Sequence, residues 1–146
     1  MSRDTKGIIM VEIQNAVSKI MGKSAGALMR SAGVSASYKI WPELPSGKSV
    51  LEAGQIMKDG VDGLGDFGDF SITSEENGIA KIEFKNCYFA RFTEQSGKPC
   101  GEQPICFFGF GLVEETFKRL TGIKVKVELI DRNDSTETCF ETASPR

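Results

Sequence analysis

Residues 104–129 read PICFFGFGLVEETFKRLTGIKVKVEL, and no other stretch of the chain constrains the architecture as strongly. Up to Leu120 the apolar residues cover more than one face at helical spacing, which predicts a buried helix that Gly122 caps. From Ile123 apolar residues occupy every second position, which is typical of a strand with one buried face. A buried helix therefore leads directly into a strand.

The neighbouring segments predict two hairpins. A turn at about residues 131–135 returns the chain as a final strand around residues 137–142. Upstream, Phe70 and Ile72 alternate with polar residues, and an Asn77-Gly78 turn precedes a second alternating run. A polar loop over residues 94–103 then leads to the buried helix.

The N-terminal half is predicted to be helical. Apolar spacing indicates a helix over residues 8–21, with Ile9, Ile13, Val17 and Ile20 on one face. A helix rich in small residues follows over 24–32 and stops at Gly33, and a third runs over about 49–59. Residues 41–47 read as a loop, and the glycine- and aspartate-rich residues 59–69 as a connector.

The order helices, hairpin, helix, hairpin predicts an α+β fold in which helices pack on an antiparallel β-sheet. At 146 residues, the chain fits a single domain over 1–146. All ten phenylalanines lie at or beyond Phe67, so we expect an apolar cavity to be built mainly from this half.

The composition argues against several classes of function. The chain has no histidine, which removes the usual general base, the Ser-His-Asp and Cys-His pairings and the commonest zinc ligand. A formal net charge of −2 without a basic stripe argues against a nucleic-acid partner, and the longest apolar or glycine stretch is too short for a membrane span. We therefore expect a cytoplasmic protein that is not an enzyme, with its cysteines as thiols or metal ligands.

The glycines at 109 and 111 allow two interpretations, since each helical glycine costs about 1 kcal/mol relative to alanine. One is close packing of the helix on the sheet, and the other is room left for a ligand. A set of carboxylates and thiols around the last hairpin also allows two interpretations, as a zinc site or as surface charges and buried thiols. Its members are Cys106, Glu128, Asp131 and Cys139.

Four segments, residues 86–89, 106–110, 120–128 and 137–140, together resemble the 4-vinyl reductase domain, also called the hydrocarbon-binding domain. The resemblance covers about residues 86–142, and the small-residue helix between Gly22 and Gly33 is similar to an early helix of the family. It implies a fold akin to the ligand-binding domains of aromatic-sensing transcriptional regulators and to vesicle-tethering particle subunits. Such domains are often dimeric and have an apolar pocket between helices and sheet.

In the aromatic-sensing members, zinc is held by a cysteine on the helix, a glutamate on the strand and two further cysteines. Cys106, Glu128 and Cys139 match three of these positions, and Asp131 stands where the family has a cysteine. A zinc ion here would be structural, tying helix to hairpin, because four protein ligands leave no open position.

Together these observations predict a module that binds or senses a small hydrophobic ligand, such as a hydrocarbon, an aromatic molecule or an acyl chain. Candidate lining residues, for which a plain core is the competing interpretation, are Phe84, Phe89, Phe92, Phe108, Phe110 and Leu112. One alternative is a homodimeric assembly or scaffold subunit without a ligand. Another, suggested only by the family name, is an accessory protein in tetrapyrrole vinyl reduction.

Overall fold

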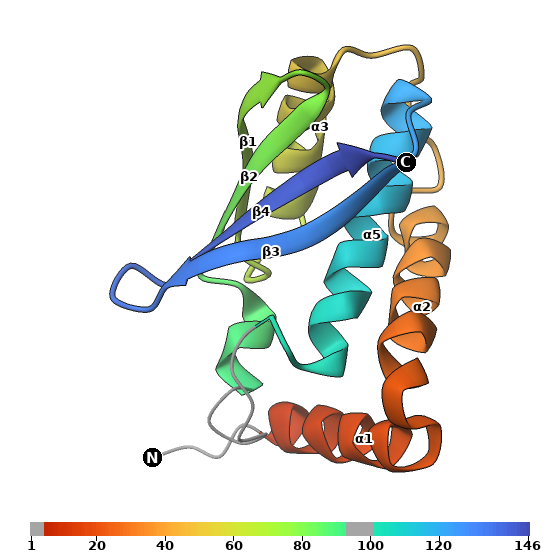
Figure 1. The fold of residues 1–146 in the computed structure, drawn as a ribbon, viewed down its shortest axis with the longest axis vertical. Helices are drawn as coiled ribbons and strands as arrows, with labels where there is room; N and C mark the ends of the chain where they lie inside the picture. The colour runs from red at the N-terminus through yellow and green to blue at the C-terminus, as the bar shows by residue number, and fades with distance from the viewer. Residues whose placement is uncertain (1–4, 93–100) are drawn as a thin grey trace.

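The structure, a computed structural model, describes residues 5–92 and 101–146, apart from the side chains of residues 91 and 92 (Figure 1). Its helices are α1 (Thr5–Met21), α2 (Ala25–Ile40), α3 (Val50–Asp62) and α5 (Pro104–Thr121), with two 3-10 helices, η1 (Gly22–Ser24) and η2 (Tyr88–Phe92). Its strands are β1 (Asp69–Glu76), β2 (Ile79–Lys85), β3 (Val125–Asn133) and β4 (Thr138–Pro145). The predicted α+β fold, with helices on an antiparallel sheet, is confirmed.

The sheet has the strand order β1-β2-β4-β3, and every neighbouring pair is antiparallel. The β1–β2 turn is formed by Asn77 and Gly78, both at positive φ (55° and 80°), as the Asn-Gly signal predicts. The second hairpin is also confirmed, although its turn comes a few residues later than predicted. Pairing of β2 with β4 joins the two hairpins into one sheet.

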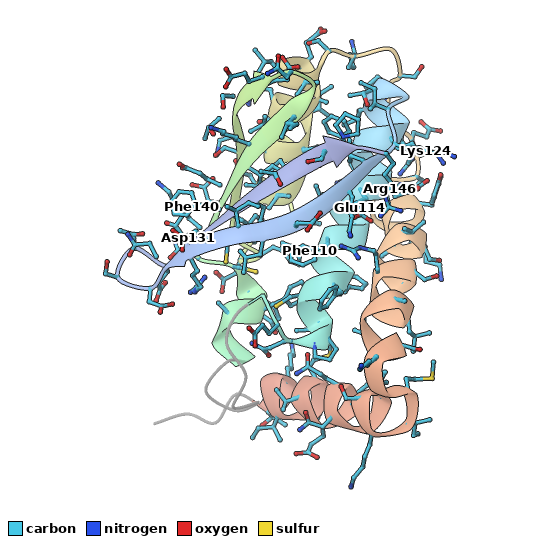
Figure 2. The ribbon with its side chains drawn as sticks, in the orientation of Figure 1. Phe110, Glu114, Lys124, Asp131, Phe140 and Arg146 are labelled. Carbon is cyan, nitrogen blue, oxygen red and sulfur yellow. The ribbon has the colours of Figure 1, made fainter. Side chains whose placement is uncertain are left out.

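A β-bulge in β3 controls which side chains face the helices. Leu129 pairs with Glu141 and Asp131 pairs with Phe140, so Ile130 is the extra residue. Beyond the bulge, Asp131 lies on the face of Phe140, away from α5, and Figure 2 shows these two side chains together. In an unbulged strand the two-residue repeat from Leu129 would have turned Asp131 toward the helices.

The helices form two layers on the inner face of the sheet. Helices α3 and α5 pack against the strands, and α2 packs along the far side of α5 (Figure 1). Between α5 and the sheet lies the main core, which includes the fully buried side chains of Phe70, Ile82, Phe117, Leu120 and Val127. The buried helix predicted from residues 104–120 therefore lies between the sheet and a second helix.

Helices α2 and α5 approach each other through glycines. A Cβ built on Gly33 would lie 2.1 Å from the Phe108 carbonyl oxygen, and one on Gly111 would lie 2.0 Å from that of Arg30. The buried hydroxyls of Ser37 and Thr116 hydrogen-bond across the same interface at 2.8 Å. The prediction that this helix stops at Gly33 was wrong: it continues to Ile40, because Gly33 serves helix contact rather than termination.

Helix α1 is held by Val11 and Gln14 on its buried side and leaves several isoleucines exposed. The buried Gln14 accepts a hydrogen bond from the Ile105 backbone N–H at 2.8 Å, at the start of α5. By contrast, Ile9, Ile13 and Ile20 are 53%, 54% and 83% exposed. Neither α1 nor any other helix within residues 5–92 and 101–146 is both long enough and apolar enough to span a bilayer.

Candidate ligand-binding site

A partly open cavity lies between α3, α5 and the inner face of the sheet. Its wall is formed by Trp41, Met57, Val61, Phe67, Phe70, Phe84, Cys87, Phe89, Gly101, Cys106, Gly109, Phe110, Leu112, Val113, Thr116, Leu129, Cys139 and Glu141. The cavity has a volume of about 60 Å³. On the same scale a single water molecule needs roughly 10–15 Å³. The space is therefore larger than a packing defect, and its wall is almost entirely apolar.

Most of the side chains predicted to line a pocket do reach this cavity. Phe84, Phe89, Phe110 and Leu112 form part of its wall. Phe108 lies outside the wall, in a smaller apolar cluster, where its ring meets that of Phe89 edge to face at a centroid distance of 6.0 Å. The side chain of Phe92 lies outside the described residues. That these residues contact a ligand remains a prediction.

A chain of edge-to-face rings lines one side of the cavity. The Phe67 ring contacts those of Phe89 and Phe84 at centroid distances of 5.4 and 6.1 Å, and Phe70 contacts Phe84 at 6.1 Å. Aromatic pairs prefer this edge-to-face arrangement, which is worth about 0.5–1.5 kcal/mol per pair beyond the burial of area. The rings therefore stabilise one another along one side of the cavity.

The two glycines of the Phe107–Gly111 run have different roles. Gly111 permits the close approach of α2, as described above, so the packing partner is a helix rather than the sheet. Gly109 faces the cavity, where an added Cβ would lie 3.5 Å from the Phe89 ring, an ordinary contact distance. The close-packing interpretation therefore applies to Gly111, whereas Gly109 leaves space in the cavity wall.

Sequence reasoning missed the contribution of the N-terminal half to the wall. Trp41, Met57 and Val61 come from the end of α2 and from α3. Trp41 is fixed by Arg119, whose Nη2 donates to its carbonyl oxygen at 2.7 Å, and by close approach of the indole ring to Gly60. The one hint in the sequence was that the chain's single tryptophan stands directly before a proline-rich loop. No local pattern predicts that this residue packs near α5.

One part of the wall is polar. It consists of Cys87, Cys106, Cys139 and Glu141. The three cysteines are thiols. Cys106, in the first turn of α5, accepts a hydrogen bond from the Gly101 backbone N–H, with 3.2 Å between nitrogen and sulfur. Cys139 Sγ accepts from Arg132 Nη1 at 2.9 Å, because the bulge turns Arg132 inward.

Among the wall residues that the structure describes, Glu141 carries the one carboxyl group. It lies on the inner face of β4, two residues from Cys139, and it pairs with Ile82 on β2 and Leu129 on β3. The pKa of Glu141 is raised to about 8, first by burial and then by the repulsion that a Cys139 thiolate would exert on the ionised carboxyl group. At neutral pH the group is therefore mostly an uncharged carboxylic acid.

The four residues predicted to hold zinc do not converge. Cys106 and Cys139 both reach the cavity wall, but Glu128 lies on the opposite face of the sheet, where it pairs with Lys126 at 3.9 Å. Asp131 lies on that opposite face too, because of the bulge. Within the described part of the chain, no three Cys, Asp or Glu side chains form a group that could hold a metal ion. The set as placed does not fit a zinc ion.

No protein-family model matches the chain, and a search of curated proteins finds no significant match. Inferences about function therefore rest on the cavity and its wall.

Proposed function

We propose that this protein binds a small apolar molecule in the cavity between its helices and its sheet. The observation that carries the proposal is the cavity itself: aromatic side chains that pack edge to face line open space between the helices and the sheet. A preformed concave site of this kind, mostly apolar with a few polar groups, is typical of small-molecule binding sites. The resemblance to the hydrocarbon-binding domain supports the same function.

Blocking the cavity tests the proposal. Gly109→Leu should place four carbon atoms in the cavity while keeping a helix-compatible residue, so it should abolish binding without unfolding the protein. Lys118→Leu adds apolar bulk to the exposed side of the same helix and is the matched control. Binding of an apolar probe can be followed through Trp41, the chain's one tryptophan, which lies in the wall.

Native mass spectrometry of the purified protein is the complementary measurement. A retained apolar compound, present in the wild type and in Lys118→Leu but absent from Gly109→Leu, would identify the ligand class directly. Equal binding of an apolar probe by all three proteins would contradict the proposal, because occupancy would then not depend on the cavity.

We also propose that the protein forms a homodimer, as the resemblance implies, and that α1 mediates it. Ile9, Ile13, Ala16 and Ile20 are exposed and follow the 4-3-4 spacing of a helix-packing seam. In a symmetric dimer the same stripe from a second copy would cover this one. Ile13→Glu should yield monomers in sedimentation, whereas Asn15→Glu, on the other side of α1, should not. A wild-type monomer at about 100 µM would contradict this assembly.

A further inference from the structure

We propose that Glu141 selects the polar group of the ligand: the cavity takes an apolar molecule with one uncharged hydrogen-bond donor, such as an alcohol, and rejects a carboxylate. This inference rests on the proposed function and deepens it, because it names the ligand's head group.

The first argument is that Glu141 has an unused hydrogen-bonding capacity. Within the described residues its carboxyl group makes no hydrogen bond or ion pair, and its partners across β2 and β3 are the apolar side chains of Ile82 and Leu129. The side chain is half-buried and forms part of the cavity wall, so its oxygens are open to the cavity and not sealed in the core. A ligand that fills the cavity would displace water from this group, and a hydrogen-bond donor on the ligand would then supply the partner that the carboxyl group needs.

The second argument concerns whether that partner donates or accepts the hydrogen bond. A carboxyl group has an acceptor oxygen in either protonation state, so a hydrogen-bond donor on the ligand can always be accommodated. The neighbouring thiols are weak donors and acceptors, and the hydroxyl of Thr116, which is also a wall residue, is already paired with that of Ser37 at 2.8 Å. Glu141 is therefore the dominant polar contact among the described wall residues. A hydroxyl group at the end of an apolar body satisfies this requirement.

The third argument is that the described part of the cavity wall offers no countercharge for an anion. Within residues 5–90 and 101–146, no lysine or arginine is among the wall residues. The nearby cation, Arg132, already contacts Cys139 and forms an ion pair with Asp134 at 2.8 Å. A carboxylate on the ligand would have to leave water without a compensating charge and would face the Glu141 carboxyl group. Fatty-acid-like ligands should therefore be excluded.

The experiment compares three six-carbon probes, hexane, 1-hexanol and hexanoate, by calorimetry and Trp41 fluorescence. The variants are Glu141→Leu, which removes the acceptor, and Glu141→Gln, which retains an acceptor and a donor. Glu128→Leu makes the same change on the opposite face of the sheet and is the control. Circular dichroism and cooperative unfolding verify that each variant is folded.

We expect Glu141→Leu to weaken 1-hexanol binding relative to hexane binding by about tenfold, while Glu141→Gln and Glu128→Leu change this ratio by less than about threefold. Wild-type protein should bind hexanoate at least about tenfold more weakly than 1-hexanol. If Glu141→Leu shifts both neutral probes equally, or if hexanoate binds as well as 1-hexanol, head-group selection is refuted while apolar binding stands. If no probe binds the wild type, the proposed function fails and this inference fails with it.

Discussion

Alanine substitutions at Gly111 and Gly109, two residues apart on α5, should change stability in opposite directions. A Cβ on Gly111 would lie 2.0 Å from the Arg30 carbonyl oxygen, whereas a Cβ on Gly109 would lie 3.5 Å from the Phe89 ring. Ordinary van der Waals contact begins near 3.4 Å, so Gly111→Ala should force α2 and α5 apart by about 1.4 Å. Gly109→Ala requires no such movement.

The magnitudes follow from packing and helix propensity. Overpacking a close interface costs about 1–3 kcal/mol, and the backbone of α2 cannot rotate away as a flexible side chain could. The separation would also stretch the Ser37–Thr116 hydrogen bond. Better helix propensity returns about 1 kcal/mol, so we expect Gly111→Ala to lose about 2 kcal/mol overall. Gly109→Ala should gain up to about 1 kcal/mol, because it receives the propensity term without the clash.

Urea and thermal unfolding, both followed by Trp41 fluorescence and far-UV circular dichroism, measure both effects. For a chain of this size each kcal/mol corresponds to a change of about 2–4 °C in Tm, so the two variants should differ by roughly 6–12 °C. The denaturant m-value should stay constant if only the native state changes. A Gly111→Ala protein at least as stable as the wild type, with an unchanged m-value, would refute the close approach of α2 and α5.

Three further predictions concern charged groups. Because the folded chain keeps the Glu141 proton up to about pH 8, whereas a carboxyl in the unfolded chain loses it near 4.5, stability should fall as pH rises between these values. Replacing Glu141 with glutamine should remove this pH dependence, which amounts to at most about 1.4 kcal/mol per pH unit for one proton, and urea unfolding at several pH values measures it. An unchanged slope would contradict the burial of the group. Glu114→Gln should lower the free energy of unfolding by about 2–3 kcal/mol in the same assay. The buried Glu114 carboxylate accepts a hydrogen bond from the Val127 backbone N–H at 2.9 Å and forms an ion pair with Arg30 at 3.2 Å. A decrease below about 0.5 kcal/mol would contradict the importance of these contacts. Asp131→Ala and treatment with a chelator should each leave Tm unchanged in differential scanning fluorimetry, because Asp131 lies on the outer face of the sheet. A drop of several degrees with either would show that these residues do bind zinc.

The hairpins were predictable because their signals are local. An Asn-Gly pair at positive φ specifies the β1–β2 turn whatever surrounds it, and alternation fixes which residues of each strand are buried. The end of α5 was predictable for the same reason, since Gly122 adopts φ 78° as a left-handed cap. In these elements the tertiary structure agrees with the local preference.

The errors occurred where distant residues determine the outcome. Gly33 resembles a helix end, but it lies inside α2 because the α5 backbone packs against it. The apolar face predicted for the first helix exists, yet Ile9, Ile13 and Ile20 point outward, and Gln14 anchors the helix instead. Neither arrangement can be read from the spacing of residues within one segment.

The candidate site was predictable in part for a similar reason. Phe84, Phe110 and Leu112 reach the cavity because they lie in β2 and α5, elements whose periodicity is clear. Phe89 also reaches it, but from the 3-10 helix η2, which no periodic pattern predicted. Glu141 carried no signal of its own, because a glutamate in an alternating strand is usually solvent-exposed. Its position toward the cavity follows from the register with β2 and β3, which no local pattern specifies.

The bulge at Ile130 marks a position in β3 where the chain could lose one residue without changing which side chains face the cavity. Since Leu129 and Arg132 face inward on either side of the 64%-exposed Ile130, deletion of that one residue would restore ordinary alternation and leave every inward side chain in place. A deletion or insertion elsewhere in β3 would reverse the orientation of the residues beyond it. Homologous chains that differ in length by one residue at this position could therefore share the same cavity, although the spacing between Glu128 and Cys139 would differ.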